Sequence, residues 1–141
     1  MTRFSPLLPA LLPALLLLSA AASAATVEVH VSNVAAGKGK LNVAVCDREH
    51  FLKQCAYTAS MPARDGENVI TVPGVPKGTW AVLVYQDENE NNELDRNLIG
   101  IPKENYGFSR NAPSRFGPPS FEDTAIQVGD GPTVEAKIRL H

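Results

Sequence analysis

The chain has 141 residues, of which 44% are hydrophobic and 20% are charged, and its formal net charge is −2. This length is suited to one compact domain with a single core. The slight excess of acidic residues argues against nucleic acid or an anionic membrane surface as a partner, because both require a basic stripe.

The first 24 residues have the pattern of a secretory signal peptide. A basic start at Arg3 is followed by an apolar run over 7–18 and by the small-x-small sequence Ala22-Ser23-Ala24. The apolar run is shorter than the roughly 20 residues that span a bilayer. We therefore expect cleavage after Ala24 and a single domain over 25–141 that is extracytoplasmic, either periplasmic or secreted, and not inserted in a membrane.

Alternating apolar and polar residues predict seven short strands, at 26–32, 40–46, 56–61, 68–72, 79–86, 124–128 and 133–140. Segment 79–86 is apolar on both faces, as is typical of a central strand buried on both sides. The only helical signal is a single turn after Asp47, which is suited to an N-cap. Short strands joined by Gly and Pro turns predict an all-β fold, a two-sheet antiparallel sandwich.

Cys46 and Cys55 predict a structural disulfide. An exported chain with an even number of cysteines favours pairing. The spacing is not that of a CxxC redox pair, and the histidine cluster of a zinc site is missing. The bond would close a short loop and add about 2–3 kcal/mol.

Segment 87–123 has neither strand nor helix periodicity, which is uncommon for so long a stretch in a small domain. It contains apolar residues that disordered segments lack, so we expect it to pack on the sandwich. Its acidic start predicts a loop around a divalent cation, because side-chain oxygens recur at the first, third, fifth and ninth positions. The candidate ligands are the side chains of Asp87, Asn89, Asn91 and Asp95 and the Glu93 backbone carbonyl.

Calcium is favoured over magnesium for this loop, because magnesium tolerates irregular cages poorly. Leu98 occupies the twelfth position, so the loop is not an EF-hand, and a missing ligand would come from Asn97, Glu104, Glu122 or Asp123. Only two carboxylates lie among the ligands within the loop, which predicts weak binding, with a Kd of about 10⁻⁴ to 10⁻³ M. The alternative is a metal-free loop held by Asx turns.

Aromatic residues follow in the same segment and offer a second candidate site. They could form a platform that binds a carbohydrate or peptide, or they could cover an open edge of the sandwich, which is the favoured alternative. These residues are Tyr106, Phe108, Phe116 and Phe121.

Four segments in this order resemble the exported bacterial family known as domain of unknown function 2141: 87–95, 100–104, 106–109 and 116–122. The resemblance covers the whole of 25–141 and implies a small β-sandwich of the immunoglobulin-like or transthyretin-like kind. It implies no activity. The chain departs from the family in having Asn92 and Glu93 where Gly and Lys are usual; asparagine tolerates the left-handed conformation, so the turn should survive.

The sequence predicts a non-enzymatic binding module with a calcium-ordered loop, whose partner is an envelope glycan or protein. The alternative is an accessory protein of the cell envelope in which the loop only stabilises the fold. A glycosidase that uses two carboxylates of the acidic segment is the least favoured, because the domain is small for a deep sugar cleft. His30 alternates onto the face opposite Val29 and Val31, so we expect it to face solvent.

Overall fold

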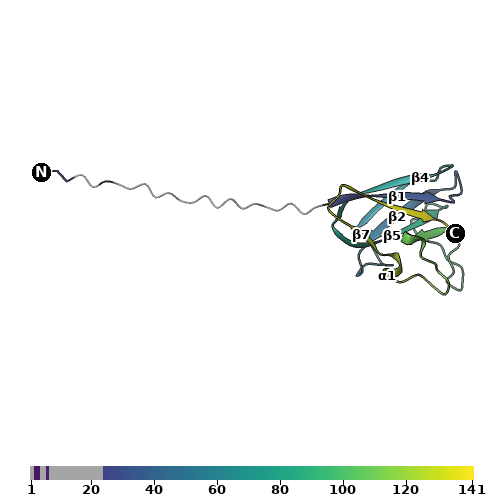
Figure 1. Ribbon diagram of the computed structural model, residues 1–141. Helices are drawn as coiled ribbons and strands as arrows, with labels where there is room; N and C mark the ends of the chain where they lie inside the picture. The colour runs from purple at the N-terminus through teal and green to yellow at the C-terminus, as the bar shows by residue number, and fades with distance from the viewer. Residues whose placement is uncertain (1, 4–5, 7–23) are drawn as a thin grey trace.

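The computed structural model describes residues 2–3, 6 and 24–141, and the segment 7–23, on which the signal-peptide prediction depends, lies outside them. The chain from residue 24 onward forms a β-sandwich (Figure 1), which confirms the predicted all-β class. The elements in chain order are β1 (Ala24–Ser32), β2 (Lys40–Cys46), β3 (Tyr57–Pro62), β4 (Asn68–Pro76), β5 (Gly78–Asp87), β6 (Tyr106–Phe108), η1 (Ser109–Asn111), α1 (Phe121–Thr124), β7 (Ile126–Val128) and β8 (Thr133–Arg139).

The strands form two sheets. One has the order β4-β1-β8 and the other the order β3-β2-β5-β6, with β7 pairing to the start of β5. All pairs are antiparallel except β1 with β8, which run parallel in register from Thr26 opposite Thr133 to Ser32 opposite Arg139. The sandwich is thus mostly, not wholly, antiparallel.

Alternation along the strands builds the core between the sheets. Val27, Val29 and Val31 of β1 are fully buried, and so are Leu41 and Val45 of β2. The opposite faces of these strands are only half-buried. As predicted, β5 is central in its sheet and has buried residues on both faces, including Ala81 outside and Val82 inside.

Three predicted elements were wrong in extent or type, whereas β1, β3, β5 and β8 differ from the prediction by only one or two residues at an end. Strand β4 continues through Pro73 to Pro76 because it pairs with the first residues of β1 across a register shift. The residues before β7 form the short helix α1, which Ser120 caps by accepting a hydrogen bond from the Asp123 N–H. The residues after Asp47 form turns and not a helix, although Asp47 Oδ1 accepts a hydrogen bond from the His50 N–H as a cap would.

The long segment after β5 is partly regular, contrary to the prediction. It contains β6, which pairs with β5, as well as η1 and α1. The backbone N–H and C=O of Tyr106 also bond to those of His141, so β6 joins the end of the other sheet. In the part of the chain that the structure describes, no helix has both the length and the apolar character needed to cross a bilayer.

Candidate functional site

A groove of about 1180 Å³ lies on the outer face of the five-stranded sheet. Strand register brings its floor residues into two rows that cross the sheet. One row is Ser60, Asn42, Tyr85 and Tyr106, and the other is Thr58, Ala44, Leu83 and Phe108. One row of the floor therefore presents hydroxyl and amide groups, and the other is mainly apolar.

Three loops far apart in sequence form the walls of the groove. They are segment 52–55 next to the disulfide, residues from 92–102 of the long loop, and segment 114–118. Four large hydrophobic side chains of these walls are exposed to solvent. Leu98 is also exposed and precedes Ile99 in the chain, but it is not one of the lining residues. The four are Leu52, Ile99, Ile101 and Phe116. A single hollow is thus bordered by most of the exposed large apolar side chains in the described part of the chain.

The charged residues that line the groove are all cationic: Lys53, Arg96 and Arg115. No aspartate or glutamate is among the lining residues, although the whole chain has 15 acidic residues against 13 Lys and Arg. Arg96 donates one hydrogen bond to the Gly100 carbonyl at 3.0 Å. Burial raises the pKa of Tyr85 on the floor, with nearby Asp87 and Glu104 acting in the same direction, so its phenol is a neutral hydrogen-bonding group near pH 7.

Asp87 organises the acidic start of the long loop from a fully buried position at the end of β5. Its carboxylate accepts hydrogen bonds from the N–H groups of Asn91 at 3.1 Å and Asn92 at 2.7 Å, and from the Asn42 amide at 3.2 Å. Asn92 adopts a left-handed backbone with φ 62°, as expected for an asparagine in this turn. Asp87 thereby links the loop to the groove floor through Asn42.

Glu104, one of the side chains considered as an additional ligand, closes the loop from its other end. Its two carboxylate oxygens accept hydrogen bonds from the N–H groups of Glu88 at 2.7 Å and Asp95 at 2.9 Å. The side chain is buried, at 8% exposure. No local pattern along the chain distinguishes Glu104 from the other candidates, because its role depends on how the loop folds back.

The remaining predicted metal ligands meet at Asp95. The side-chain amides of Asn89 and Asn91 donate to its carboxylate at 2.6 and 2.9 Å, and the Glu93 N–H donates to Asn91 Oδ1 at 3.0 Å. The loop is therefore closed by Asx-type hydrogen bonds. An amide can present either its oxygen or its nitrogen by turning over, so the same side chains can offer oxygens to a cation.

The predicted aromatic residues separate into two groups. Phe108 and Phe121 are buried, each 6% exposed, and Phe51 packs edge-on against both, with ring centroids 6.4 and 5.7 Å away. Phe116 is fully exposed and Tyr106 is half-buried, and both line the groove. The structure therefore brings Tyr106, Phe108 and Phe116 to the groove, Phe108 as a largely buried floor residue, and uses Phe121 for packing.

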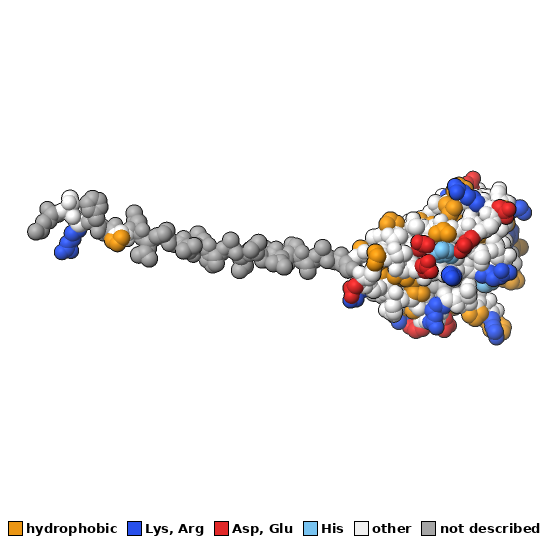
Figure 2. Space-filling model, turned by 45° about the horizontal axis from the view of Figure 1, so that its top comes forward, with side chains coloured by type: hydrophobic (Ala, Val, Ile, Leu, Met, Phe, Trp, Pro, Cys, Tyr) orange, Lys and Arg blue, Asp and Glu red, His pale blue; other side chains and the backbone are white. Residues whose placement is uncertain are grey.

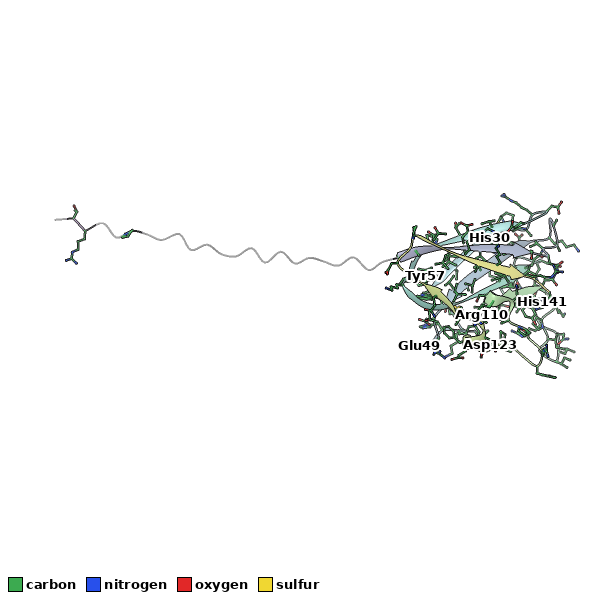
Figure 3. All side chains as sticks on the ribbon, in the orientation of Figure 1. His30, Glu49, Tyr57, Arg110, Asp123 and His141 are labelled. Carbon is green, nitrogen blue, oxygen red and sulfur yellow. A yellow bond between two sulfur atoms is a disulfide. The ribbon has the colours of Figure 1, made fainter. Side chains whose placement is uncertain are left out.

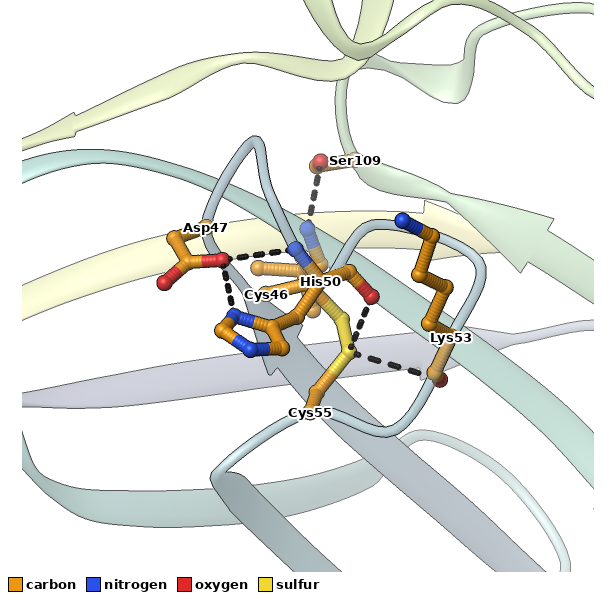
Figure 4. Close-up of a disulfide and its surroundings, with 7 residues drawn as sticks. Cys46, Asp47, His50, Lys53, Cys55 and Ser109 are labelled. Carbon is orange, nitrogen blue, oxygen red and sulfur yellow. Dashed lines mark hydrogen bonds and ion pairs between the residues drawn. A yellow bond between two sulfur atoms is a disulfide. The ribbon is translucent and has the colours of Figure 1, made fainter.

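The predicted Cys46–Cys55 disulfide is present, with a Cα–Cα distance of 5.0 Å (Figure 4). It fixes the turn in which Asp47 Oδ1 accepts from the His50 N–H at 2.8 Å and contacts the His50 ring at 2.7 Å. These hydrogen bonds, the backbone one first, lower the pKa of Asp47. Arg48 of the same turn pairs with Glu122 of α1 and stacks 4.7 Å above the Phe121 ring, and this ion pair lowers the pKa of Glu122.

His30 lies at the centre of a second charged cluster, on the outer face of the other sheet (Figures 2 and 3). It was expected to face solvent, but its ring is held between carboxylates: Nδ1 is 2.8 Å from Glu67, and Nε2 is 2.7 Å from Glu28 and 3.7 Å from Glu135. The bond to Glu67, more than any other contact, raises the pKa of His30. Strand register explains the cluster, because β1 places Glu28 directly opposite Glu135 of β8.

Glu28, His30 and Glu135 are also the group, among the residues that the structure describes, whose potential metal-ligand atoms lie within 4.8 Å of one another. Asp87, Asp95 and Glu104 do not form such a group there. Both ring nitrogens of His30 face carboxylate oxygens, and only the imidazolium has two N–H groups to donate to them. We therefore interpret the cluster as an ion-pair network around a protonated histidine.

A family model with the description "Uncharacterized protein conserved in bacteria (DUF2141)" matches residues 29–136. The match spans the sandwich from β1 to β8 and includes the acidic loop, the groove and the disulfide. No curated protein and no solved structure matches the chain.

Proposed function

For this chain, which belongs to the bacterial family of uncharacterised proteins DUF2141, we propose the function of an exported, non-enzymatic binding module. The ligand site is the groove on the outer face of the five-stranded sheet. The single observation that supports this proposal most strongly is the convergence of exposed hydrophobic side chains from three separate loops on one hollow. Exposed apolar patches on soluble domains commonly mark interaction sites.

Export is supported by the disulfide, because such bonds persist in oxidising compartments, and by the signal-peptide pattern of the first 24 residues. A periplasmic or secreted location follows from both. A binding role in place of catalysis is supported by the character of the groove, whose lining has three cations and no carboxylate to serve as an acid or a base.

Calcium orders the loop between β5 and β6 in this proposal. Asn89, Asn91 and Asp95 already meet around one point, and Asp87 and Glu104 hold the loop at both ends. The ion would replace the amide-to-carboxylate bonds with oxygen ligands from the same side chains, at the weak affinity typical of extracellular modules, with a Kd of about 10⁻⁴ to 10⁻³ M. The loop supplies one wall of the groove, so its order would favour ligand binding.

The groove is tested with Nile red, a neutral apolar dye whose fluorescence rises on burial. The variant Ile99→Ser/Phe116→Ser should bind the dye at least several-fold more weakly, because it loses two exposed apolar walls. Val69→Ser is the matched control, since Val69 is also an exposed hydrophobic residue but lies on β4 of the other sheet. Equal dye binding by all three proteins would overturn the binding function and favour an accessory envelope protein.

The calcium proposal is tested by thermal unfolding with millimolar calcium or with chelator. Asp95→Asn is the informative variant, because Asp95 is only partly buried, whereas loss of the buried Asp87 carboxylate would destabilise the loop with or without an ion. We expect calcium to raise the Tm of the wild type and not that of Asp95→Asn, with Asp130→Asn, an exposed acid paired to Lys77, as control. Identical melting curves with calcium and with chelator would rule the ion out.

A further inference from the structure

We infer that the groove binds a single amphipathic anion, a long-chain carboxylate, with its apolar chain along the floor and its head group at the cationic rim. This inference rests on the proposed binding function and names the class of ligand. Three observations carry it: the charge of the lining, the composition of the floor, and the pairing of the strands beneath it.

The positive charge of the lining residues favours an anionic ligand. Lys53, Arg96 and Arg115 come from three different loops, and each lines the same hollow. They are not among the ion pairs found in the described part of the chain, and no acidic residue lines the groove to neutralise them. A carboxylate at the rim would therefore meet positive charge from three loops, and guanidinium groups suit carboxylate geometry. Asp87 and Glu104 act on Tyr85 of the floor, so the floor itself is not a place for the anionic head group.

The side chains of the floor and walls favour a ligand with an apolar chain. Leu83 and Phe108 lie on the floor beside Tyr85 and Tyr106, and Ile99, Ile101, Leu52 and Phe116 stand around them. Mostly apolar walls with a few polar groups are usual for sites that take small molecules. The volume of about 1180 Å³ is ample for an extended acyl chain.

The pairing of the strands disfavours a peptide as the occupant. β2 lies between β3 and β5, and β5 lies between β2 and β6, so the two central floor strands already have partners on both sides, and β3 has an unpaired edge only at the outer side of the groove. A peptide that adds to a sheet needs unpaired backbone groups at an edge, and the floor presents side chains. A membrane surface is disfavoured as the partner, because four of the exposed large apolar side chains border a hollow. Insertion into a bilayer would instead favour apolar side chains on a protruding surface.

The test compares three dodecyl compounds, all kept monomeric: dodecanoate, the neutral dodecyl maltoside and dodecyltrimethylammonium. Binding is measured by calorimetry and located by amide chemical-shift changes. We expect dodecanoate to bind at least about five-fold more tightly than the neutral compound, as one well-placed ion pair allows, and the cationic compound to bind most weakly. The preference should shrink in high salt.

Lys53→Gln and Arg115→Gln are the informative variants, because each removes one rim charge and keeps a long polar side chain. Each should lower the preference for dodecanoate over dodecyl maltoside by about two- to five-fold, because only the anionic ligand pairs with the rim charge. Arg64→Gln, an exposed arginine outside the groove, should have no effect.

The outcomes separate this inference from the proposed function. Nile red binding in the groove with no preference for dodecanoate, or a preference that survives both substitutions, would overturn the anion and keep the binding module. Absence of Nile red and dodecanoate binding would overturn both. Sedimentation with phosphatidylglycerol vesicles, or shift changes caused by an acidic apolar peptide, without binding of monomeric dodecanoate would replace the inferred ligand with a membrane or a peptide.

Discussion

Gln86 is a fully buried polar side chain that fixes the connection between β1 and β2. Its amide nitrogen donates to the carbonyls of Ala35 and Lys38, both at 2.7 Å, and its amide oxygen accepts from the Ala35 N–H at 2.9 Å. Three backbone groups of that loop therefore have their partner in one side chain of β5. Buried backbone groups without partners are costly, so this position should tolerate little change.

We predict that Gln86→Leu lowers the free energy of unfolding by on the order of 3 kcal/mol, because it leaves the Ala35 N–H and the Lys38 carbonyl without their partner and leaves the Ala35 carbonyl with only the Lys38 N–H. Urea unfolding measures the loss. Gln127→Leu is the control, since Gln127 is exposed and bonds only to the Thr79 hydroxyl among the described side chains; it should change stability by less than about 0.5 kcal/mol. Similar losses in the two variants would contradict the assigned role of Gln86.

The His30 cluster predicts a dependence of stability on pH. Its folded-state pKa is raised from 6.5 by Glu67 and then by Glu28, so the folded state binds the proton more tightly than the unfolded state. The stabilisation is therefore fully present below about pH 6.5 and is lost as the pH rises through the higher folded-state pKa. Glu135 and Lys137 on β8 also face this ring, and their charges act in opposite directions.

His30→Gln should remove the part of the pH dependence of stability that comes from titration of the His30 ring. We expect the stability difference between the wild type and His30→Gln to be largest near pH 6 and to shrink toward about pH 8. Urea unfolding at a series of pH values measures it, and His141→Gln is the histidine control outside the cluster. A difference that stays constant over this range would show that His30 does not titrate as the cluster requires.

The turn closed by Cys46 and Cys55 connects the sandwich to the groove, because residues 52–55 form one wall. We predict that reduction of the disulfide lowers the free energy of unfolding by about 2–3 kcal/mol and weakens dye binding in the groove. Urea unfolding with and without reductant measures the first effect. A Cys46→Ala/Cys55→Ala variant should show no response to reductant, and a response in it would assign the effect to something other than the bond.

Strands with one buried face and one exposed face were predictable from the alternation of apolar and polar residues. The partner of each strand in its sheet was not predictable in this way. Segment 40–46 was predicted with the observed bounds of β2, because apolar residues alternate without interruption. β6 has only three residues and depends on its pairing with Leu83 and Tyr85 of β5, so no local pattern marks it. The parallel pairing of β1 with β8 joins residues more than a hundred positions apart, and alternation alone does not specify a strand's partner.

Gly107 lies where β6 packs directly against β8 of the other sheet. A Cβ atom there would lie 2.6 Å from Ile138 Cγ2 and 2.8 Å from the Arg139 carbonyl oxygen, both on β8. We predict that Gly107→Ala costs about 1–3 kcal/mol, because backbone must move to admit the methyl group. Gly129→Ala is the control, with nothing within 4 Å; urea unfolding that gave equal stability for both variants would contradict this packing.

The candidate site was predictable only in part, because the tertiary fold assembles it. The spacing of Asp87, Asn89, Asn91 and Asp95 indicated a loop whose side chains converge, and those of Asn89, Asn91 and Asp95 do. Asp87 instead accepts from the backbone N–H groups of Asn91 and Asn92. The groove takes residues from seven regions between Asn42 and Pro118, and its cationic rim has no signal along the chain. Phe116 was identified by residue type, but only the fold distinguishes it from the buried Phe121.

The position of β1 in its sheet has a consequence for the order of folding. This strand is synthesised first, yet its neighbours are β4 and the final strand β8. In a chain emerging from a ribosome, this valine-rich strand can pair with β4 once residue 76 has appeared, but its other edge stays unpaired until residue 139 has appeared. Pairing over such a distance is slow, so we expect the three-stranded sheet to be completed late in folding, which would suit the export proposed for this chain.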